Sequence, residues 1–562
     1  MELITDLKSI RKEIGLRLEE STLYPKLNLD AYKDVTPILL KRGPKDYALL
    51  VKEVETGNFT PGGSAEPVIR KHRIKVIYYS SYFTWYKIAQ KRSEFPPDET
   101  RALQKVFKGK TLTIHPDMAL SRFLRLSEGF DLQFPGPFLP LSGKVWAYSL
   151  SPPSVEKAFL RKRRETNQWA VRAIERELQM SAKDRAWVKK RLFAPPFKSF
   201  AVLDQLLKQA GLTSVLASSP INLQEMTGIA LDRLQDHFLS LYHRGKVTLL
   251  SHRPIAGLGL KRPVIFQSLS EAIQELAGDG PLGVEEKHLD IGRALPLGLS
   301  RLQSASNLFR AWRELRSGQD LGAYIMGSLA TKFAMEGALE MARQRLQAKK
   351  PVFEKDVEKA FYQLLKQYET KAQTPLQLDP YFMVLHAGIR TGYPSLPGFF
   401  RLSDEMNSLK LDAGILVKDR GLVLACSDLA RSLTTNAQGE DLYRLLEKAM
   451  LEAAIPGGKE GATGEDVYWA GMQPLIQAEK TLRAWNLIPK NGDLKQHYNR
   501  DIGHTFGKQE STTLFFKKGE NQMRLRSGMV SAIEYQWPYK GYALGIEDMF
   551  VVGPHHGINI TR

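Results

Sequence analysis

Two segments near the C-terminal end place acidic residues inside otherwise apolar strands, and this pattern limits the folds open to the chain. In LKLDAGILVKDRGLVLACSDLARSL (409–433), two apolar strands flank DRG, and Gly421 suits the left-handed position of a three-residue hairpin loop. A loop centred on Arg420 places Asp412 directly opposite Asp428. Facing residues have Cβ atoms roughly 4.5–5.5 Å apart, so two like charges there destabilise the hairpin.

A second hairpin repeats this arrangement. The segment GMVSAIEYQWPYKGYALGIEDMFVVG (528–553) has Lys540-Gly541 as a candidate two-residue turn, which pairs Glu534 with Glu547. Two carboxylates that face each other between apolar strands need a proton or a cation between them. Each hairpin therefore predicts a site for positive charge.

One histidine belongs with these acids. His504 lies in DIGHTFGKQESTT (501–513) between Gly503 and Gly507, where a backbone or a ligand can approach closely. Four carboxylates and one imidazole form a mainly oxygen site, which favours Mn²⁺, Co²⁺, Fe²⁺ or Zn²⁺ over a thiolate-selected metal. Two ions ~3.5–4 Å apart fit such a set. Any one of these acids alone is more often a strand-edge residue facing water, but all five residues in matching contexts predict a metal site.

The motifs resemble those of the creatinase, prolidase and aminopeptidase P group, which has the pita-bread fold. In the family's order, the chain contains LDAG, SDLARS, GHTFG, GMVSAIE and GIEDMFVV. The resemblance implies two divalent ions, with Mn²⁺ as the first expectation. The ligands that it implies are Asp412, Asp428, His504, Glu534 and Glu547.

The same resemblance implies an activity. Asp428 and Glu547 would bridge the ions, and a bridging hydroxide would attack the scissile carbonyl of a peptide. Glu534 would move the proton, so that Glu534 and His504 take the catalytic roles. The implied enzyme is a metallopeptidase similar to Xaa-Pro aminopeptidase or dipeptidase, which cleaves near the N-terminus of a peptide and forms a homodimer.

The chain departs from the family pattern where substrate is held. Ser511 and Arg500 stand where family histidines are usual, and GYPSLPGFF (392–400) lacks another. Tyr535 replaces a usual proline, and Gly545 replaces an arginine that often precedes Ile-Glu-Asp. The missing histidines stabilise an oxyanion, and one such donor contributes roughly 10²–10³ in rate. We therefore expect a retained metal site with an altered substrate-binding shell.

Three residues are candidates to replace the missing histidines in that shell: Glu510, His386 and His497. Each of them is more often an ordinary surface residue. A second hypothesis follows from the losses, namely a catalytically weakened or inactive pita-bread protein that binds peptides or anionic partners. Retention of all five ligand types favours the enzyme.

The chain of 562 residues is too long for one core, and we expect an α+β protein of several domains. The C-terminal pita-bread catalytic domain is preceded by one or two α/β creatinase-type N-terminal domains, which SSPINLQEMTG suggests most directly. The predicted divisions are an N-terminal α/β domain that is a possible diverged copy (1–150), a basic helical linker (151–197), a creatinase-type α/β domain (198–300) and the metallopeptidase domain (301–562). The last domain contains an internal echo. A long helix, a break and then EKDVEKAFYQLL resemble a later long helix, IPGG and then GEDVYWAGMQPLI, a pattern that a duplicated half would produce.

Composition restricts the cellular setting and the partners. No stretch approaches the ~20 apolar residues of a membrane helix, and the start MELITDLKSIRKE lacks an apolar signal core. A single cysteine, Cys426, fits a reducing compartment, so we expect a cytoplasmic protein. The net charge of +19 permits a nucleic-acid partner. Because the basic residues are dispersed and no nucleic-acid-binding motif is found, that partner is not favoured.

Overall fold

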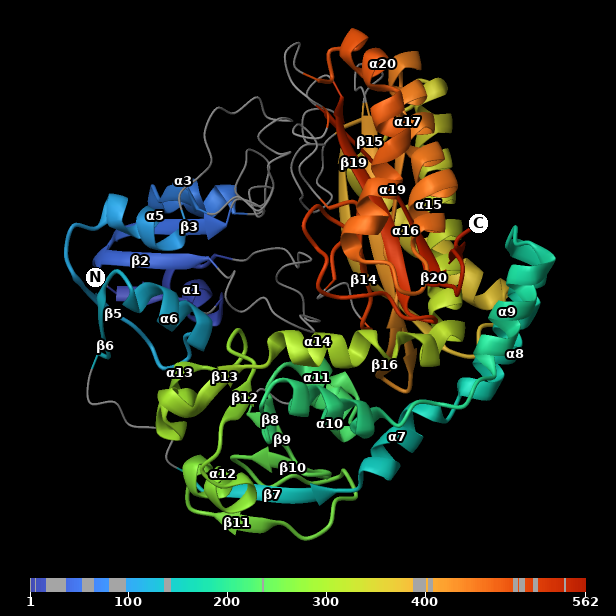
Figure 1. Ribbon diagram of the computed structural model, residues 1–562. Helices are drawn as coiled ribbons and strands as arrows, with labels where there is room; N and C mark the ends of the chain where they lie inside the picture. Colours follow the sequence, from blue (N-terminus) through green and yellow to red (C-terminus); the bar gives the residue numbers. More distant parts are fainter. Residues whose placement is uncertain are drawn as a thin grey trace.

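The computed structural model arranges the chain in three units, each built on one β-sheet (Figure 1). The structure describes residues 2–5, 7–16, 37–52, 65–79, 98–135, 143–234, 237–387, 401–402, 408–488, 494, 501–508, 514–539 and 542–562. Among the described residues, no helix is long and apolar enough to cross a membrane.

The N-terminal unit has a six-stranded mixed sheet, drawn in blue in Figure 1. Its strands in spatial order are β4 (Lys75–Tyr79), β3 (Asp46–Lys52), β2 (Ile38–Gly43), β1 (Glu2–Ile4), β5 (Thr111–Thr113) and β6 (Asp131–Gln133). Its helices are α1 (Leu7–Ile14), α3 (Glu66–His72), α5 (Glu99–Val106) and α6 (Leu120–Ser127). The residues after Arg73 include many β-branched and aromatic side chains, a composition that favours a strand, and β4 forms there.

The second unit has a seven-stranded sheet. Its strands in spatial order are β11 (Val264–Phe266), β7 (Val145–Leu150), β10 (Lys246–Ser251), β9 (Phe238–His243), β8 (Ser214–Ala217), β12 (Leu282–Val284) and β13 (Leu302–Ser304). Its main helices are α10 (Ser199–Gln209), α11 (Pro220–Thr227), α12 (Leu269–Ala277), α13 (Ile291–Ala294) and α14 (Ser306–Glu314). Strand β7 therefore lies in the second sheet, although the sequence analysis placed residues 145–150 in the first unit.

The two sheets share a topology over five strands. In each, a first strand pairs antiparallel with the second and parallel with a later strand, as β1 does with β2 and β5 and as β8 does with β9 and β12. The next strand outward on each side, β3 and β6 in the first sheet and β10 and β13 in the second, also has the same order and direction in both sheets. The outermost strands differ, since β4 is parallel to β3 whereas β7 is antiparallel to β10. The two sheets therefore share the order and direction of these five strands, and the origin of the first unit as a diverged copy stays a prediction.

The predicted helical linker is a set of three helices, α7 (Pro152–Leu160), α8 (Arg163–Glu177) and α9 (Ala182–Leu192). In Figure 1, α8 and α9 lie beside the C-terminal domain, and α7 lies next to the second unit. Trp169 of α8 is buried, and its indole Nε1 donates a hydrogen bond of 2.9 Å to the carbonyl of Ala372. The segment is thus part of the apolar core that joins the second unit to the C-terminal domain.

The C-terminal domain has an eight-stranded antiparallel sheet. Six strands form the path β14 (Gln377–Ala387), β15 (Ser408–Asp419), β17 (Leu429–Thr434), β20 (Tyr542–Val552), β19 (Val530–Tyr539) and β18 (Gly503–Thr505). Off this path, β16 (Leu422–Cys426) pairs with β15 and β21 (Gly557–Asn559) pairs with β20.

Helices cover this sheet in two sets. The first set is α15 (Leu321–Gln347) and α16 (Glu354–Lys371), and the second is α17 (Ala437–Ala449), a π-helix (Met450–Ala454), α18 (Ile455–Gly457), α19 (Gly464–Gln477) and α20 (Glu479–Ala484). A short 3₁₀ helix at Ser317–Asp320 separates α14 from α15. A Cβ on Gly318 would lie 2.2 Å from the carbonyl oxygen of Gly528, so backbones meet at this break.

The internal echo corresponds to two halves of the sheet. After the first helix set come β14, β15 and β17, and after the second set come β18, β19 and β20. The order β14-β15-β17-β20-β19-β18 is symmetric about the junction of β17 with β20. The duplicated half that the sequence suggested therefore exists as a pseudo-twofold arrangement of strands.

A buried ion cluster joins the second unit to the segment after β18. The ammonium of Lys508 lies 2.9 Å from Glu225 Oε1 of α11 and 3.6 Å from Asp320 Oδ2. Arg316 also forms an ion pair with Glu225. Burial disfavours the charged form of Glu225, but Lys508 and Arg316 outweigh it and lower the pKa of that carboxyl. The cluster fixes Lys508, four residues beyond His504, to the second unit.

Replacement of Glu225 by alanine should lower the free energy of unfolding by about 3–5 kcal/mol, because it leaves buried cations without their counter-ion. Urea unfolding followed by tryptophan fluorescence measures this, since Trp312 packs 4.6 Å beneath the Arg316 guanidinium. The matched control is Glu340→Ala, which removes the partner of Arg343 on an exposed helix face and should cost less than about 1 kcal/mol. Equal losses in both variants would contradict a structural role for the cluster.

Candidate metal centre

Strand pairing places three of the predicted acidic ligands in one row across the C-terminal sheet. Asp412 of β15 pairs with Ala430 of β17, and Ala430 pairs with Glu547 of β20. Glu547 in turn pairs with Glu534 of β19. The two halves of the sheet meet where β17 pairs with β20. Neighbouring strands lie about 4.7–4.9 Å apart, so the three acids lie at this junction or one strand away from it.

The second predicted hairpin register is confirmed. Glu534 and Glu547 are cross-strand partners, and the pairing continues without a shift to Tyr539 and Tyr542. Lys540 and Gly541, the expected turn, lie outside the described residues. Because no bulge interrupts this pair of strands, counting from the turn gives the correct partners.

The first predicted register is wrong by two residues. Asp419 pairs with Leu422, so the turn is a two-residue loop of Arg420 and Gly421, both with positive φ, rather than a three-residue loop. A bulge next to Val417 adds a further shift, and Asp412 faces Ala430 instead of Asp428. Asp428 lies just before β17.

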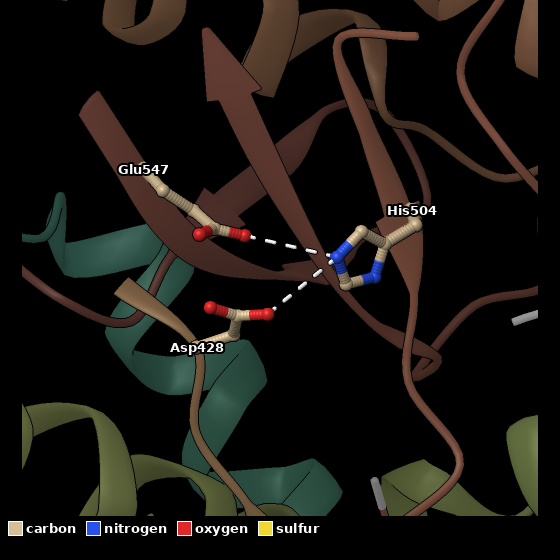
Figure 2. Close-up of side chains that lie close together, drawn as sticks. All are labelled: Asp428, His504 and Glu547. Carbon is tan, nitrogen blue, oxygen red and sulfur yellow. Dashed lines mark ion pairs between the residues drawn. The ribbon is translucent and has the colours of Figure 1, made fainter. Parts of the chain in front are cut away.

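Three of the five predicted ligands converge. Asp428, His504 and Glu547, here called the inner cluster, are buried and offer ligand atoms that all lie within 4.8 Å of one another. His504 Nε2 is 3.7 Å from Asp428 Oδ2 and 3.8 Å from Glu547 Oε1. Figure 2 shows the two carboxylates side by side, with the imidazole ring pointing at both.

The histidine is held in the state that binds a metal. His504 Nδ1 is 3.1 Å from the carbonyl oxygen of Thr505. Because a carbonyl oxygen only accepts, Nδ1 carries the hydrogen, and the lone pair of Nε2 faces the carboxylates. Such an outer hydrogen bond is the usual way to fix the tautomer of a metal-binding histidine.

The donor set fits a divalent cation. The distances of 3.7 and 3.8 Å from Nε2 to the two carboxylates are too long for hydrogen bonds. Ligands that each lie 2.0–2.2 Å from one ion are roughly 3–4 Å from each other, so an ion fits between these atoms. Two buried carboxylates also need nearby positive charge. Asp428, His504 and Glu547 would thus hold the ion.

Gly503 and Gly507, on either side of His504, lie so close to neighbouring chain segments that a side chain at either position would clash. A Cβ on Gly503 would lie 2.1 Å from the carbonyl oxygen of Ala532 on β19, and its φ of +142° disfavours other residues. A Cβ on Gly507 would lie 2.9 Å from the Cβ of Arg313, whose Nε donates to the Gly507 carbonyl. The glycine spacing therefore sets the position of the imidazole.

Arg431 locks the two carboxylate-bearing strands together. Its guanidinium donates to Asp548 Oδ1 at 2.6 Å and to the Glu547 carbonyl at 2.7 Å. Burial opposes the charged form of Arg431, but the neighbouring Asp548 more than offsets this and raises the pKa of the guanidinium. Arg431 is the arginine of the SDLARS motif. Its hydrogen bonds to the Glu547 carbonyl and to Asp548 explain why the motif contains an arginine.

The other two predicted ligands, Asp412 and Glu534, hold neighbouring side chains. Asp412 Oδ2 forms an ion pair of 3.0 Å with the ammonium of Lys410, and Glu534 Oε1 accepts a hydrogen bond from the Gln536 amide. Sequence analysis missed Lys410 and Gln536. The sequence did contain a signal for Lys410. It is a lysine in an apolar strand, two residues before Asp412, so the two side chains lie on the same face of the strand.

Several predicted substrate-shell residues lie outside the described residues: Glu510, Ser511, His497, Arg500 and the segment 392–400. His386 lies in β14, where its backbone pairs with Lys410, and its side chain is also outside the description. Tyr535 is buried, and its hydroxyl donates to the carbonyl of Gly471 at 2.7 Å. The side chain of Tyr535 lies on the opposite face of the sheet from that of Glu534, because adjacent residues of a strand alternate in direction.

The two-half sheet and its cluster of acids and one histidine define a pita-bread protein with a metallopeptidase-type centre. Residues 331–554 match the model of metallopeptidase family M24. The matched range contains all five predicted ligands. The comparison with curated protein sequences gave no match.

The solved structures that this chain matches include an X-prolyl aminopeptidase, a prolidase and a domain of a FACT complex subunit. X-prolyl aminopeptidase from Caenorhabditis elegans, described as a cytosolic enzyme with a di-nuclear active site, aligns with a TM-score of 0.52 and 11% identity, over 100% of this chain and 86% of its own. Prolidase from Pyrococcus horikoshii OT3 aligns with a TM-score of 0.48 and 17% identity, over 65% of this chain and 98% of its own. The N-terminal domain of FACT complex subunit SPT16 from chickpea aligns with a TM-score of 0.48 and 13% identity, over 65% of this chain and 95% of its own. At 11% identity, the likeness to the X-prolyl aminopeptidase shows a shared fold and nothing further.

Addition of Mn²⁺ to chelator-treated protein should raise its melting temperature, because a ligand that binds the folded state alone stabilises it. The gain is about 2.7 kcal/mol at a hundredfold excess over the dissociation constant. Asp428→Asn should remove most of this shift. The matched control is Asp379→Asn, which changes an acid of β14 that pairs with Lys418 and should keep the shift. Identical shifts in both variants would exclude the inner cluster as the metal site.

Proposed function

We propose that the protein is a metal-dependent peptidase that hydrolyses a peptide bond near the N-terminus of its substrate, with an altered substrate-binding shell. The observation that carries the proposal is the convergence of the Asp428 and Glu547 carboxylates on the lone pair of His504 Nε2. The match of residues 331–554 to the M24 family model supports the same conclusion. Xaa-Pro aminopeptidases and dipeptidases are the models for its substrate class.

The donor set also indicates which ion is bound. Carboxylate oxygens with one imidazole suit Mn²⁺ first, and Co²⁺, Fe²⁺ or Zn²⁺ next. A divalent ion in this position acidifies water toward neutral pH and polarises a substrate carbonyl. Asp428, His504 and Glu547 would hold that ion in a place from which bulk water is largely excluded, since all three side chains are buried.

Glu534 is the proposed proton carrier. It is the cross-strand partner of Glu547, so it lies next to the inner cluster, and it is more exposed than Glu547. A carboxylate in this position takes a proton from the attacking water and returns it to the leaving amine. The Gln536 amide, which donates to Glu534 Oε1, orients that carboxylate.

The remaining expectations are proposals about the setting of the enzyme. They comprise a peptide partner, a homodimer and a cytoplasmic location. Glu510, His386 and His497 stay candidates for the substrate shell. Nucleic acid is the less favoured partner, because the net charge of +19 is dispersed along the chain.

A second candidate is a pita-bread protein that binds peptides or anionic partners and has weak or no catalysis. Two observations favour it. The net charge is +19, and the Lys410 ammonium is bound to Asp412, which is one of the expected ligands. Activity measurements separate the two candidates.

A panel of Xaa-Pro dipeptides, Xaa-Pro tripeptides and non-proline controls, assayed with Mn²⁺ or Co²⁺, should show metal-dependent release of the N-terminal residue. Asp428→Asn should lower turnover by more than about 100-fold, beyond the 10–100-fold typical of residues that only support a ligand. Asp379→Asn, remote from the inner cluster, should retain it. Absence of turnover in protein that still binds the metal would reject the peptidase and favour the binding function.

A further inference from the structure

Lys410 brings a buried positive charge into the row next to the expected ligands. It lies on β15 two residues before Asp412, and successive residues of a strand alternate in direction, so the two side chains share a face. The residue is only 3% exposed, and its Nζ lies 3.0 Å from Asp412 Oδ2. A buried ammonium is rare unless it is paired, and its partner here is Asp412.

Room for Lys410 depends on Gly545 of β20. A Cβ at this position would lie 2.6 Å from Lys410 Cε and 3.0 Å from Cδ. Ser432, the cross-strand partner of Lys410, holds the Gly545 backbone through hydrogen bonds of 3.0 Å to its carbonyl and 2.9 Å from its amide. The lysine stem therefore lies across β17 toward β20, in space that any larger residue at 545 would fill.

The five expected ligands thus divide into two groups. Asp428, His504 and Glu547 converge on one point. Asp412 and Glu534 instead interact with Lys410 and Gln536, which lie in the adjacent row of the sheet. A second ion would need Asp412, and it would bind a carboxylate that already holds the ammonium. Two cations repel each other strongly at such distances in a buried site.

We propose that this centre binds a single divalent ion through the inner cluster, and that the Lys410 ammonium replaces a second ion at Asp412. The proposal rests on the metal site in the proposed function but does not depend on peptide hydrolysis. One ion and one fixed ammonium then supply the positive charge that the buried acids need.

The number of bound ions tests this directly in the full-length chain. Chelator-treated protein is titrated with Mn²⁺ by calorimetry and examined by electron paramagnetic resonance, which separates isolated from spin-coupled Mn²⁺. The wild-type chain should bind one equivalent with an uncoupled spectrum. Lys410→Met keeps the length of the side chain without its charge, and should bind two equivalents with a spin-coupled spectrum.

Two further variants keep the test decisive if Lys410→Met fails to fold, as judged by circular dichroism. Asp412→Asn should still bind one equivalent with less than a tenfold change in affinity, because Asp412 serves Lys410 rather than the ion. Lys418→Met is the matched control, since Lys418 lies on the same strand but pairs with Asp379, and it should behave as wild type.

The outcomes distinguish this inference from the proposed function. Two tightly bound, spin-coupled ions in the wild-type chain would overturn the single-ion centre and leave the peptidase intact. Loss of an ion in Asp412→Asn, or one equivalent in a folded Lys410→Met, would also overturn the role of Lys410. No Mn²⁺ binding in any variant would overturn both the inference and the proposed function.

Discussion

Buried negative charge at the centre of the C-terminal sheet is the constraint on which the rest of the structure depends. Asp428 and Glu547 are carried to one point inside the protein, facing the lone pair of His504 Nε2. Carboxylates removed from water need positive charge or donors beside them. The chain supplies part of that charge with Lys410 at Asp412 and Arg431 at Asp548, and the geometry of the inner cluster suits a divalent ion for the rest.

The pseudo-twofold sheet explains why the charges meet where they do. Each half contributes an acid from its middle strand, Asp412 in β15 and Glu534 in β19. Each half also contributes an acid at the junction, Asp428 just before β17 and Glu547 in β20. His504 comes from the edge strand β18, whose continuation is tied to the second unit through Lys508. The centre therefore depends on both halves of the domain and on the unit that precedes it.

Sequence reasoning succeeded where a feature was local. Acids inside apolar strands are costly, so they marked the predicted ligand positions, and the glycines around His504 correctly indicated close backbone approach. The Glu534 and Glu547 register followed from an uninterrupted pair of strands. The Asp412 register did not, because a two-residue turn and a bulge together move the partner by two residues. Turn type and bulges respond to packing that the strand sequence does not contain.

The sequence by itself determined the class of fold, the residue types of the centre and their order along the chain, because motif spacing and strand periodicity are local properties. Tertiary structure alone decided which of the five ligands converge and what the others touch. Lys410 reaches Asp412 only because Gly545, 135 residues later in the chain, leaves space for its stem. Burial and charge pairing depend on segments that meet only on folding, and so the partner of each buried charge is a property of the folded state.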